Sequence, residues 1–473
     1  MNPERIVSAL REAVLTMSAA LVTMACAMAI DPEPGPVTLA IVLAYALSRS
    51  HLDHDLRGRL EAAVILPIVS LGALAVGMLL LHVPWIGAIV FVAGMGLSIW
   101  LRRFGPATRR AGSLVGMPFI VILITPYIPS THYGPLMAAL IPVIVALLAL
   151  VWVALFHALG RKIRWLSPVV RSEPSVIAKV SPASSLRPDA STRMAMQMMV
   201  ALATAFVIGY VFFAERWAWV VLTAYIVNAG NQGRLDVAYK SVLRVLGAMF
   251  GTVLALTVTA HLGAHDTSTV MMILLAVFLG MWLRPISYAW WALFVTVALA
   301  LLQGFEGQSP EHILVLRMQE IVIGAILGVV SAWLVFPVRS RQVLRRRMAD
   351  ALAALAEACD PATVAASSVT FKAAMGQVES VAPAFRALRR VSKRASQPQP
   401  ADWIDVMLEI RDLSIPLIAG GASPPHVRQA IGRARKSLRS PEQIQHALID
   451  LRDALGVDTS TRQPAAIESV PIT

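Results

Sequence analysis

The chain has 473 residues, of which 57% are hydrophobic and only 15% are charged, and its mean hydropathy is +0.67. Soluble domains carry about 25% charged residues, so this composition excludes an ordinary soluble protein and makes lipid the solvent for much of the chain. The formal net charge of +13 is typical of a nucleic-acid binder. However, the cations lie between apolar segments and in the tail, as the positive-inside rule requires, and we expect no nucleic-acid partner.

Six apolar segments fall in the first third of the chain. A helix that spans a bilayer needs about 20 mostly apolar residues, and the segments cover 9–30, 36–50, 60–81, 84–101, 113–129 and 133–157. Arg5, Arg11 and the stretch Ala27-Met28-Ala29 also fit a secretory signal peptide around the first segment. We expect this segment to be retained, because it supplies the first helix of a repeat.

A polar connector over 161–192 leads to six further apolar segments, at 193–214, 216–231, 241–262, 268–283, 286–305 and 313–336. At a constant offset of 182 residues, Arg11 matches Arg193 and Trp100-Leu101-Arg102 matches Trp282-Leu283-Arg284. Because six is even, both halves share one orientation. We therefore predict an all-α membrane protein of about twelve transmembrane helices in two parallel six-helix repeats, over 1–160 and 193–337.

Charge orients these predicted helices in the membrane. One set of loops carries most of the cations, including the run that begins at Arg102, whereas the other set carries acids such as Asp31 and Glu306, with Arg216 as its one loop cation. The positive-inside rule then places both termini in the cytoplasm. The predicted location is the bacterial inner membrane.

Residues 338–473 contain no apolar segment long enough to span a membrane. They predict a soluble helical domain on the cytoplasmic side, with helices at 340–358, 367–395, 402–418, 424–438 and 441–455, separated by Pro, Gly and Ser. Arg345-Arg346-Arg347 follow the last span directly, and we expect them to bind anionic lipid.

Amides and charges interrupt the apolar pattern after the second helix of the second repeat. Asn228 is predicted about one turn inside the membrane and Asn231 at its cytoplasmic face, where an amide either bonds a neighbouring helix or lines a wet path. Arg244 opens the next span and shares a face with Gly247 and Gly251, whose spacing lets another helix approach closely. Arg244 is either a snorkelling interfacial residue or a cation at the inner mouth of an anion path.

The last predicted span also combines ionisable residues with a spaced pair of glycines. Arg317, Glu320, Gly324 and Gly328 fall on one helical face. An ionisable residue inside a membrane is a functional candidate by default, although Arg317 and Glu320 could equally neutralise each other. Arg244 and Arg317 would bracket a route for a negative solute.

Three patterns follow one another along this half of the chain: apolar-Leu222-Thr223-Ala224, then Arg244-x-x-Gly247-x-x-x-Gly251, and finally Arg317…Gly324-x-x-x-Gly328…Phe336-Pro337. Together they resemble the fusaric acid resistance and aromatic acid exporter family, and six-helix units of this kind are similar to plant malate-channel relatives. The resemblance is most specific over 193–337 and thinner over 1–160. It departs at Ala248, where family members often place Thr. It implies export of aromatic or other organic acids, in some members alongside a periplasmic adaptor protein.

Aromatic residues near this predicted path suit a ring-bearing acid, although Trp and Tyr also gather at membrane interfaces. They are Tyr210, Trp217, Trp219, Tyr225, Tyr288, Trp290 and Trp291. The sequence has no phosphate-binding loop of the Walker type and no nucleophile–base set, so we expect neither an enzyme nor a cofactor. The histidines in "HLDHD" (51–55) have no second cluster and predict no metal site, while His261 and His265 could at most sense pH.

The sequence thus predicts an inner-membrane exporter of organic anions, with aromatic carboxylic acids favoured, driven by the proton gradient or the membrane potential. The predicted path residues are Arg244, Asn228, Arg317, Glu320, Tyr225 and Asn231, and Glu320 is the expected coupling group. The alternatives are an anion channel and a membrane-anchored scaffold or regulator that acts through 338–473. A homo-oligomer and an adaptor stay open.

Overall fold

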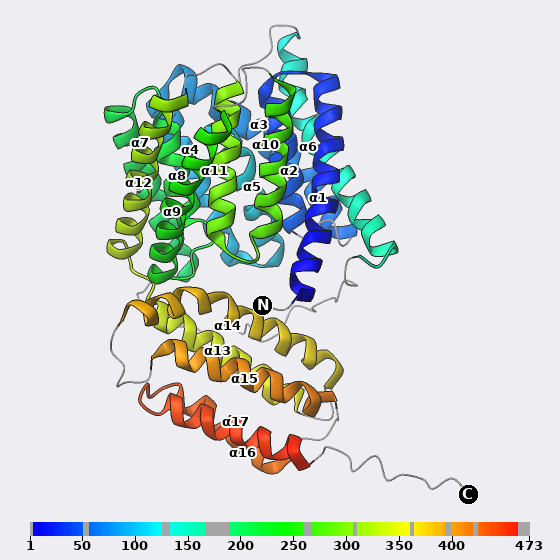
Figure 1. Cartoon of the computed structure of the whole chain (residues 1–473), viewed down its shortest axis with the longest axis vertical. Coiled ribbons are helices and arrows are strands. Elements are labelled where there is room, and N and C mark those ends of the chain that lie inside the picture. Colours follow the sequence, from blue (N-terminus) through cyan, green and yellow to red (C-terminus); the bar gives the residue numbers. More distant parts are fainter. Residues whose placement is uncertain are drawn as a thin grey trace, which may run out of the picture. The chain divides into compact units, whose positions relative to one another are not determined.

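The computed structural model describes residues 3–50, 56–124, 133–165, 189–259, 266–305, 310–359, 364–392, 399–419 and 424–461. Within these ranges all regular structure is helical, which confirms the all-α part of the prediction. The chain divides into two units (Figure 1). We call 1–169 with 185–338 the membrane unit, and 170–184 with 339–473 the C-terminal unit.

The first half of the membrane unit contains one helix for each predicted segment. These are α1 (Pro3–Ile30), α2 (Pro34–Ser50), α3 (Leu56–His82), α4 (Pro84–Trp100), α5 (Pro106–Ile124) and α6 (Pro135–Lys162), with a short 3₁₀ turn at Leu101–Phe104. Most of them begin at a proline, whose fixed φ and missing N–H suit the first helical position. Helix α5 starts seven residues before the predicted 113, because its polar first turns precede the apolar run.

The second half follows the same plan, with α7 (Ala190–Phe212), α8 (Trp217–Asn228), α9 (Arg234–Thr259), α10 (Thr267–Leu283), α11 (Tyr288–Phe305) and α12 (Pro310–Leu334). By length and hydropathy alone, eight helices in the described residues could cross a membrane: α1, α3, α4, α6, α7, α9, α11 and α12. Helices α8, α10 and the last part of α5 are apolar but shorter. The chain is therefore a multi-pass membrane protein.

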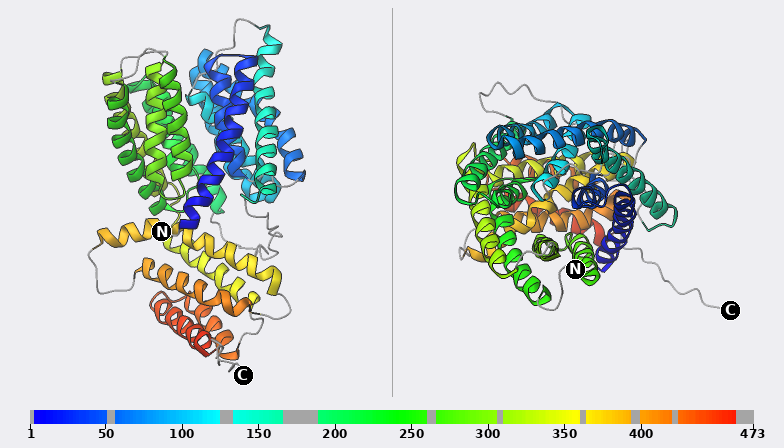
Figure 2. Two further views of the ribbon diagram at one scale, coloured as in Figure 1. Left: turned by 45° about the vertical axis from the view of Figure 1, so that its right-hand side comes forward. Right: turned by 90° about the horizontal axis from the view of Figure 1, so that it is seen from above.

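Several helices in the two halves have corresponding neighbours. Helix α1 packs on α2 and α6, and α7 packs on α8 and α12; α3 packs on α5 and α6, and α9 packs on α11 and α12. Between the halves, α4 contacts α7 and α10 contacts α1. Figure 2 draws the first six helices in blue and cyan and the next six in green.

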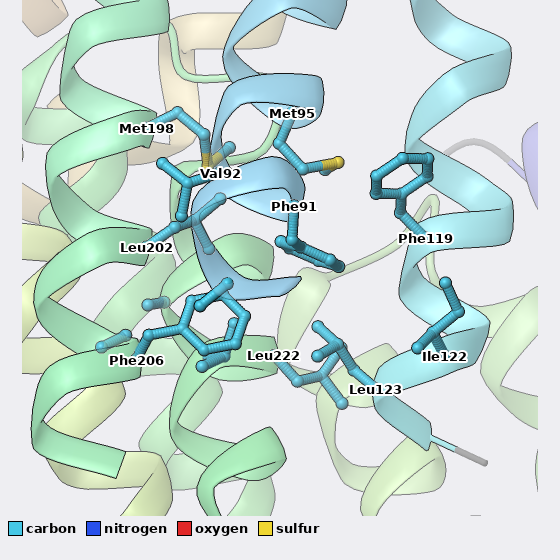
Figure 3. Close-up of a cluster of buried hydrophobic side chains, with 14 of the residues drawn as sticks. Phe91, Val92, Met95, Phe119, Ile122, Leu123, Met198, Leu202, Phe206 and Leu222 are labelled. Carbon is cyan, nitrogen blue, oxygen red and sulfur yellow. The ribbon is translucent and has the colours of Figure 1, made fainter. Parts of the chain in front are cut away.

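The contact between the halves contains the largest apolar core of the membrane unit. Phe91 of α4 lies between Phe119 of α5 and Phe206 of α7, with ring centroids 5.4 Å away in each case (Figure 3). Leu222 of α8 belongs to the same cluster. Because this core draws on both halves, it fixes α7 and α8 against the first six helices.

Helix α8 is short and central. It has 12 residues, which corresponds to about 18 Å, less than the thickness of a bilayer core, and most of its side chains are buried. It ends in the elbow, residues 229–233, where Gly230 and Gly233 have φ angles of 64° and 119°. Those left-handed values favour glycine, so the chain reverses here into α9.

The first residue of α9, directly after the elbow, contacts the end of α12 and the segment that follows it. The N–H of Arg234 donates to the carbonyl of Val338 at 3.2 Å, and the guanidinium group of Arg234 lies 5.0 Å from the ring centroid of Trp333. Phe336, between these contacts, has a φ of 43°. The chain therefore leaves the membrane unit through a segment that is bonded to the start of α9.

The C-terminal unit is a helical bundle of α13 (Ser340–Ala358), α14 (Val364–Val391), α15 (Pro400–Ala419), α16 (Pro425–Ser437) and α17 (Ile444–Thr461). Asp405 of α15 accepts hydrogen bonds from Arg386 at 2.6 Å and Arg389 at 2.8 Å, both on α14. Hydrogen bonds to Asp402 and then Asp405 raise the pKa of Arg389 above its usual value. This network joins α14 to α15.

Candidate functional site: a buried arginine pair

Two glycines of α9 place that helix directly on α11. A Cβ on Gly247 would stand 2.7 Å from the carbonyl oxygen of Ala289, and one on Gly251 would stand 2.6 Å from that of Leu293. Only glycine allows backbones to approach this closely. Arg244 lies one turn before Gly247 on the same face, so it also enters the helix interface.

Two glycines of α12 pack on α8 in the same way. A Cβ on Gly324 would stand 2.6 Å from the carbonyl oxygen of Val220 and 2.8 Å from Cβ of Thr223, while one on Gly328 would stand 2.9 Å from Nδ2 of Asn228. The face of α12 that carries these glycines also carries Arg317 and Glu320. Both ionisable side chains are consequently turned into the protein.

Arg244 is fully buried, with an exposed fraction of 0%. None of its three guanidinium nitrogens has a hydrogen-bond partner in the described part of the chain, and the hydroxyl of Tyr288 on α11, which lies within electrostatic range, is also without one. A snorkelling arginine keeps its charged end exposed, and this one does not. Its charge is therefore desolvated and unmatched by a direct bond.

Arg317 is 1% exposed but partly held. Its Nη1 donates to Oε1 of Gln303 on α11 at 3.2 Å, and its guanidinium carbon lies 4.1 Å from the ring centroid of Trp219, a cation–π contact. Its Nε and Nη2 have no hydrogen-bond partner among the described residues. Two donors of Arg317 thus remain open to a ligand.

Glu320 is also 1% exposed, and neither of its carboxylate oxygens accepts a hydrogen bond within the described ranges. It acts on Arg317 through space without bonding it, and Arg244 lies within electrostatic range of the same arginine. The buried groups Arg244 and Glu320 thus both act on the guanidinium group of Arg317. An uncompensated buried charge is costly, and a bound anion would offset that cost.

The predicted asparagines do not join this cluster. Asn231 donates from Nδ2 to Oε1 of Gln197 at 3.0 Å, and its Oδ1 accepts from the N–H of Gly233 at 2.6 Å. Asn228 donates to the carbonyl of Ala224 in its own helix at 3.0 Å. Both amides therefore hold the end of α8 and the elbow.

Tyr225 faces the first half of the chain. Its hydroxyl lies 2.9 Å from the place where a Cβ on Gly116 of α5 would stand. Among the other aromatic candidates, Trp219 and Tyr288 lie beside the arginine pair, whereas Tyr210 and Trp217 pack on each other with ring centroids 5.2 Å apart.

Sequence reasoning missed two glutamines, Gln197 and Gln303. Nε2 of Gln197 donates to the carbonyls of Ala332, Val335 and Phe336 at 3.4, 2.9 and 3.3 Å, respectively. Each glutamine is an isolated amide in an apolar helix, and such an amide must find a partner inside the protein. That signal could have identified both residues.

Gln197→Leu is expected to destabilise the membrane unit. The change leaves the α12 carbonyls and Nδ2 of Asn231 without their partner, at a cost of about 1–3 kcal/mol for each buried group left unsatisfied. The effect is measured as the shift of the thermal unfolding midpoint of the purified full chain in detergent, monitored by size-exclusion chromatography. Gln319→Leu on the exposed side of α12 is the matched control, and equal shifts for both variants would contradict this role.

The histidines singled out in the sequence lie outside the described residues. They are the two in the "HLDHD" stretch (51–55), together with His261 and His265. Within the ranges that the structure does describe, no group of three or more His, Cys, Asp or Glu residues is arranged to hold a metal ion.

Comparison with known proteins bears on the helices that carry the arginine pair. Residues 201–331 match the family model described as fusaric acid resistance protein-like. The chain is also 29% identical over 175 residues to the p-hydroxybenzoic acid efflux pump subunit AaeB of Enterobacter cloacae subsp. cloacae, a match that covers 34% of this chain and 26% of that relative. The matched family segment contains Arg244, Arg317 and Glu320. Model and relative agree with the resemblance seen in the sequence: residues 201–331 are similar to the fusaric acid resistance protein-like family.

Proposed function

We propose that the chain exports organic anions, and aromatic carboxylates above all, across the bacterial inner membrane, with Arg244 and Arg317 as the binding cations. The observation that carries the proposal is the pair of buried guanidinium groups, five of whose six nitrogens lack hydrogen-bond partners in the described structure. A carboxylate accepts the hydrogen bonds that such groups have open. The printed name of the relative, an efflux pump for p-hydroxybenzoic acid, supports the substrate class.

The proposed architecture is twelve transmembrane helices in two parallel repeats, with both termini and the C-terminal unit in the cytoplasm. The corresponding neighbours of α1–α6 and α7–α12 support this arrangement. Helix α6, which holds the place of α12 in the first half, has no acidic residue and no arginine before Arg161. The ionisable cluster thus belongs to the second repeat, which supports one anion site per chain.

The membrane potential alone can drive this export. An anion that leaves the cell gains about 2.3 kcal/mol per charge for each 100 mV. We propose that a proton gradient contributes through Glu320. The relative is called a pump subunit, which supports a partner protein for this chain as well, with a periplasmic adaptor as the proposed type.

Uptake of labelled 4-hydroxybenzoate into everted inner-membrane vesicles tests the proposal. A membrane potential and a pH gradient are imposed separately, and uptake above that of vesicles without the protein is the expected result. If vesicles with and without the protein take up equal amounts, and the protein is verified to be inserted, export is excluded. The alternative of a scaffold that acts through the C-terminal unit would then be favoured. Flux that responds to a pH gradient at zero membrane potential would favour a proton-coupled carrier over an anion channel.

Glu320→Gln is expected to remove the response of flux to the pH gradient, because an amide cannot exchange a proton. Glu320→Asp keeps a carboxylate at nearly the same place and should keep the response. The measurement is the ratio of flux with a pH gradient to flux without one, at zero membrane potential. A Gln variant with the wild-type ratio would exclude Glu320 as the coupling group.

A further inference from the structure

The formal charges of the buried cluster do not cancel. Among the described residues, the fully buried charged groups here are the cations Arg244 and Arg317 and the carboxylate of Glu320, so these three carry a single excess positive charge. Asp236 and Lys240, earlier in α9, bond each other at 2.7 Å and add no charge. Arg216, at the partly exposed start of α8, also acts on Glu320, but it is not fully buried and therefore does not belong to the buried set.

We propose that Glu320 sets the valence of the transported anion, so that the site takes an anion with one negative charge and rejects one with two. This inference rests on the proposed function, because it assumes that the arginine pair binds the substrate. It goes further by stating how many charges the substrate carries and which residue decides that number.

The placement of Glu320 suits such a role. Arg317 directs its bonded nitrogen to Gln303 and its flat face to Trp219, so its remaining donors stay open while the charge of Glu320 acts from nearby. The carboxylate therefore lowers the total charge of the site without occupying the hydrogen-bond donors. Glu320 thus supplies one of the two negative charges that neutralise the arginine pair, and the ligand supplies the other.

A second negative charge on the ligand would meet this carboxylate inside a buried cluster. Like charges held close together at a desolvated site repel each other strongly. A singly charged ligand neutralises the excess charge of the arginine pair and avoids that repulsion. Removing the charge of Glu320 should consequently make room for one more negative charge on the ligand.

Three ligands of nearly one size separate charge from shape. Terephthalamide is neutral, 4-carbamoylbenzoate carries one negative charge and terephthalate carries two, because each differs from the next by an amide in place of a carboxylate. Binding of each to the purified full chain in detergent at pH 7.5 is measured by calorimetry or by competition with labelled 4-hydroxybenzoate.

The wild type is expected to bind 4-carbamoylbenzoate most tightly. Glu320→Gln should shift the ratio of the terephthalate and 4-carbamoylbenzoate dissociation constants in favour of terephthalate by about tenfold or more, whereas Glu320→Asp should keep the wild-type ratio. Arg244→Gln lowers the charge of the site, so it should shift preference the other way, towards terephthalamide. These opposite shifts keep the test decisive even where one variant folds poorly.

The outcomes distinguish the two proposals. A folded wild type that binds none of the ligands, nor 4-hydroxybenzoate, overturns the proposed function. A wild type that binds them, with a ratio that neither Glu320→Gln nor Arg244→Gln changes, overturns the valence role and leaves the anion site in place.

Discussion

Arg244→Met is expected to abolish anion export and, at the same time, to make the protein more stable. The wild-type guanidinium is fully buried, with no hydrogen-bond partner in the described residues, so its desolvation is not offset by a direct bond. Methionine keeps much of the length and volume without the charge. Replacing buried ionic groups by apolar residues of similar size is often stabilising by about 1–4 kcal/mol.

The measurement combines flux in everted vesicles with thermal unfolding in detergent. Flux should fall by about a hundredfold, in keeping with the loss of a buried charge contact, and the unfolding midpoint should rise by about 2–4 °C or more. Val242→Met on the exposed side of the same helix is the control, because its side chain is 57% exposed and lies away from the arginine pair; it should leave flux nearly intact. If Arg244→Met lowers both flux and stability, the arginine is structural.

Gly324→Ala is expected to disrupt the packing of α12 on α8 and to reduce the yield of folded protein. The added Cβ would stand 2.6 Å from a backbone oxygen of α8, which cannot move aside as a flexible side chain can. Overpacking of this kind costs about 1–3 kcal/mol. Since Arg317 and Glu320 share that face of α12, any folded variant should also lose flux.

Gly72→Ala on α3 provides the matched control, because a Cβ there meets no atom within 4 Å. The same change should be neutral or stabilising by up to about 1 kcal/mol, since alanine favours a helix more than glycine does. Folded yield is read from monodisperse elution of the full chain. If the two alanine variants have equal yields, then close contact between α12 and α8 is not needed for folding.

The order of the helices could be read from the sequence, because runs of apolar residues of the required length are hard to mistake. Their ends were less predictable. Helix α6 continues to Lys162 rather than to the predicted 157, since a helix runs on through polar residues that the apolar pattern does not count. Helix α8 ends at Asn228 rather than at the predicted 231, because Gly230 and Gly233 turn the chain.

The ionisable residues of the site could also be selected, because Arg244, Arg317 and Glu320 stand out in apolar helices. Their contacts could not. A spacing of three residues between Arg317 and Glu320 suggests an ion pair, yet Gln303 and Trp219, which come from other helices, take the guanidinium instead. Competition from partners distant in the sequence is invisible to local spacing.

The bond from Arg234 to Val338 has a mechanical consequence. Transport that changes the angle between α9 and α12 must stretch this link or carry it along, and the strained backbone at Phe336 lies beside it. Arg339, the next residue, opens the C-terminal unit. The link therefore restrains the start of α9 relative to the segment after α12, so that any motion that separates the two must first break this hydrogen bond.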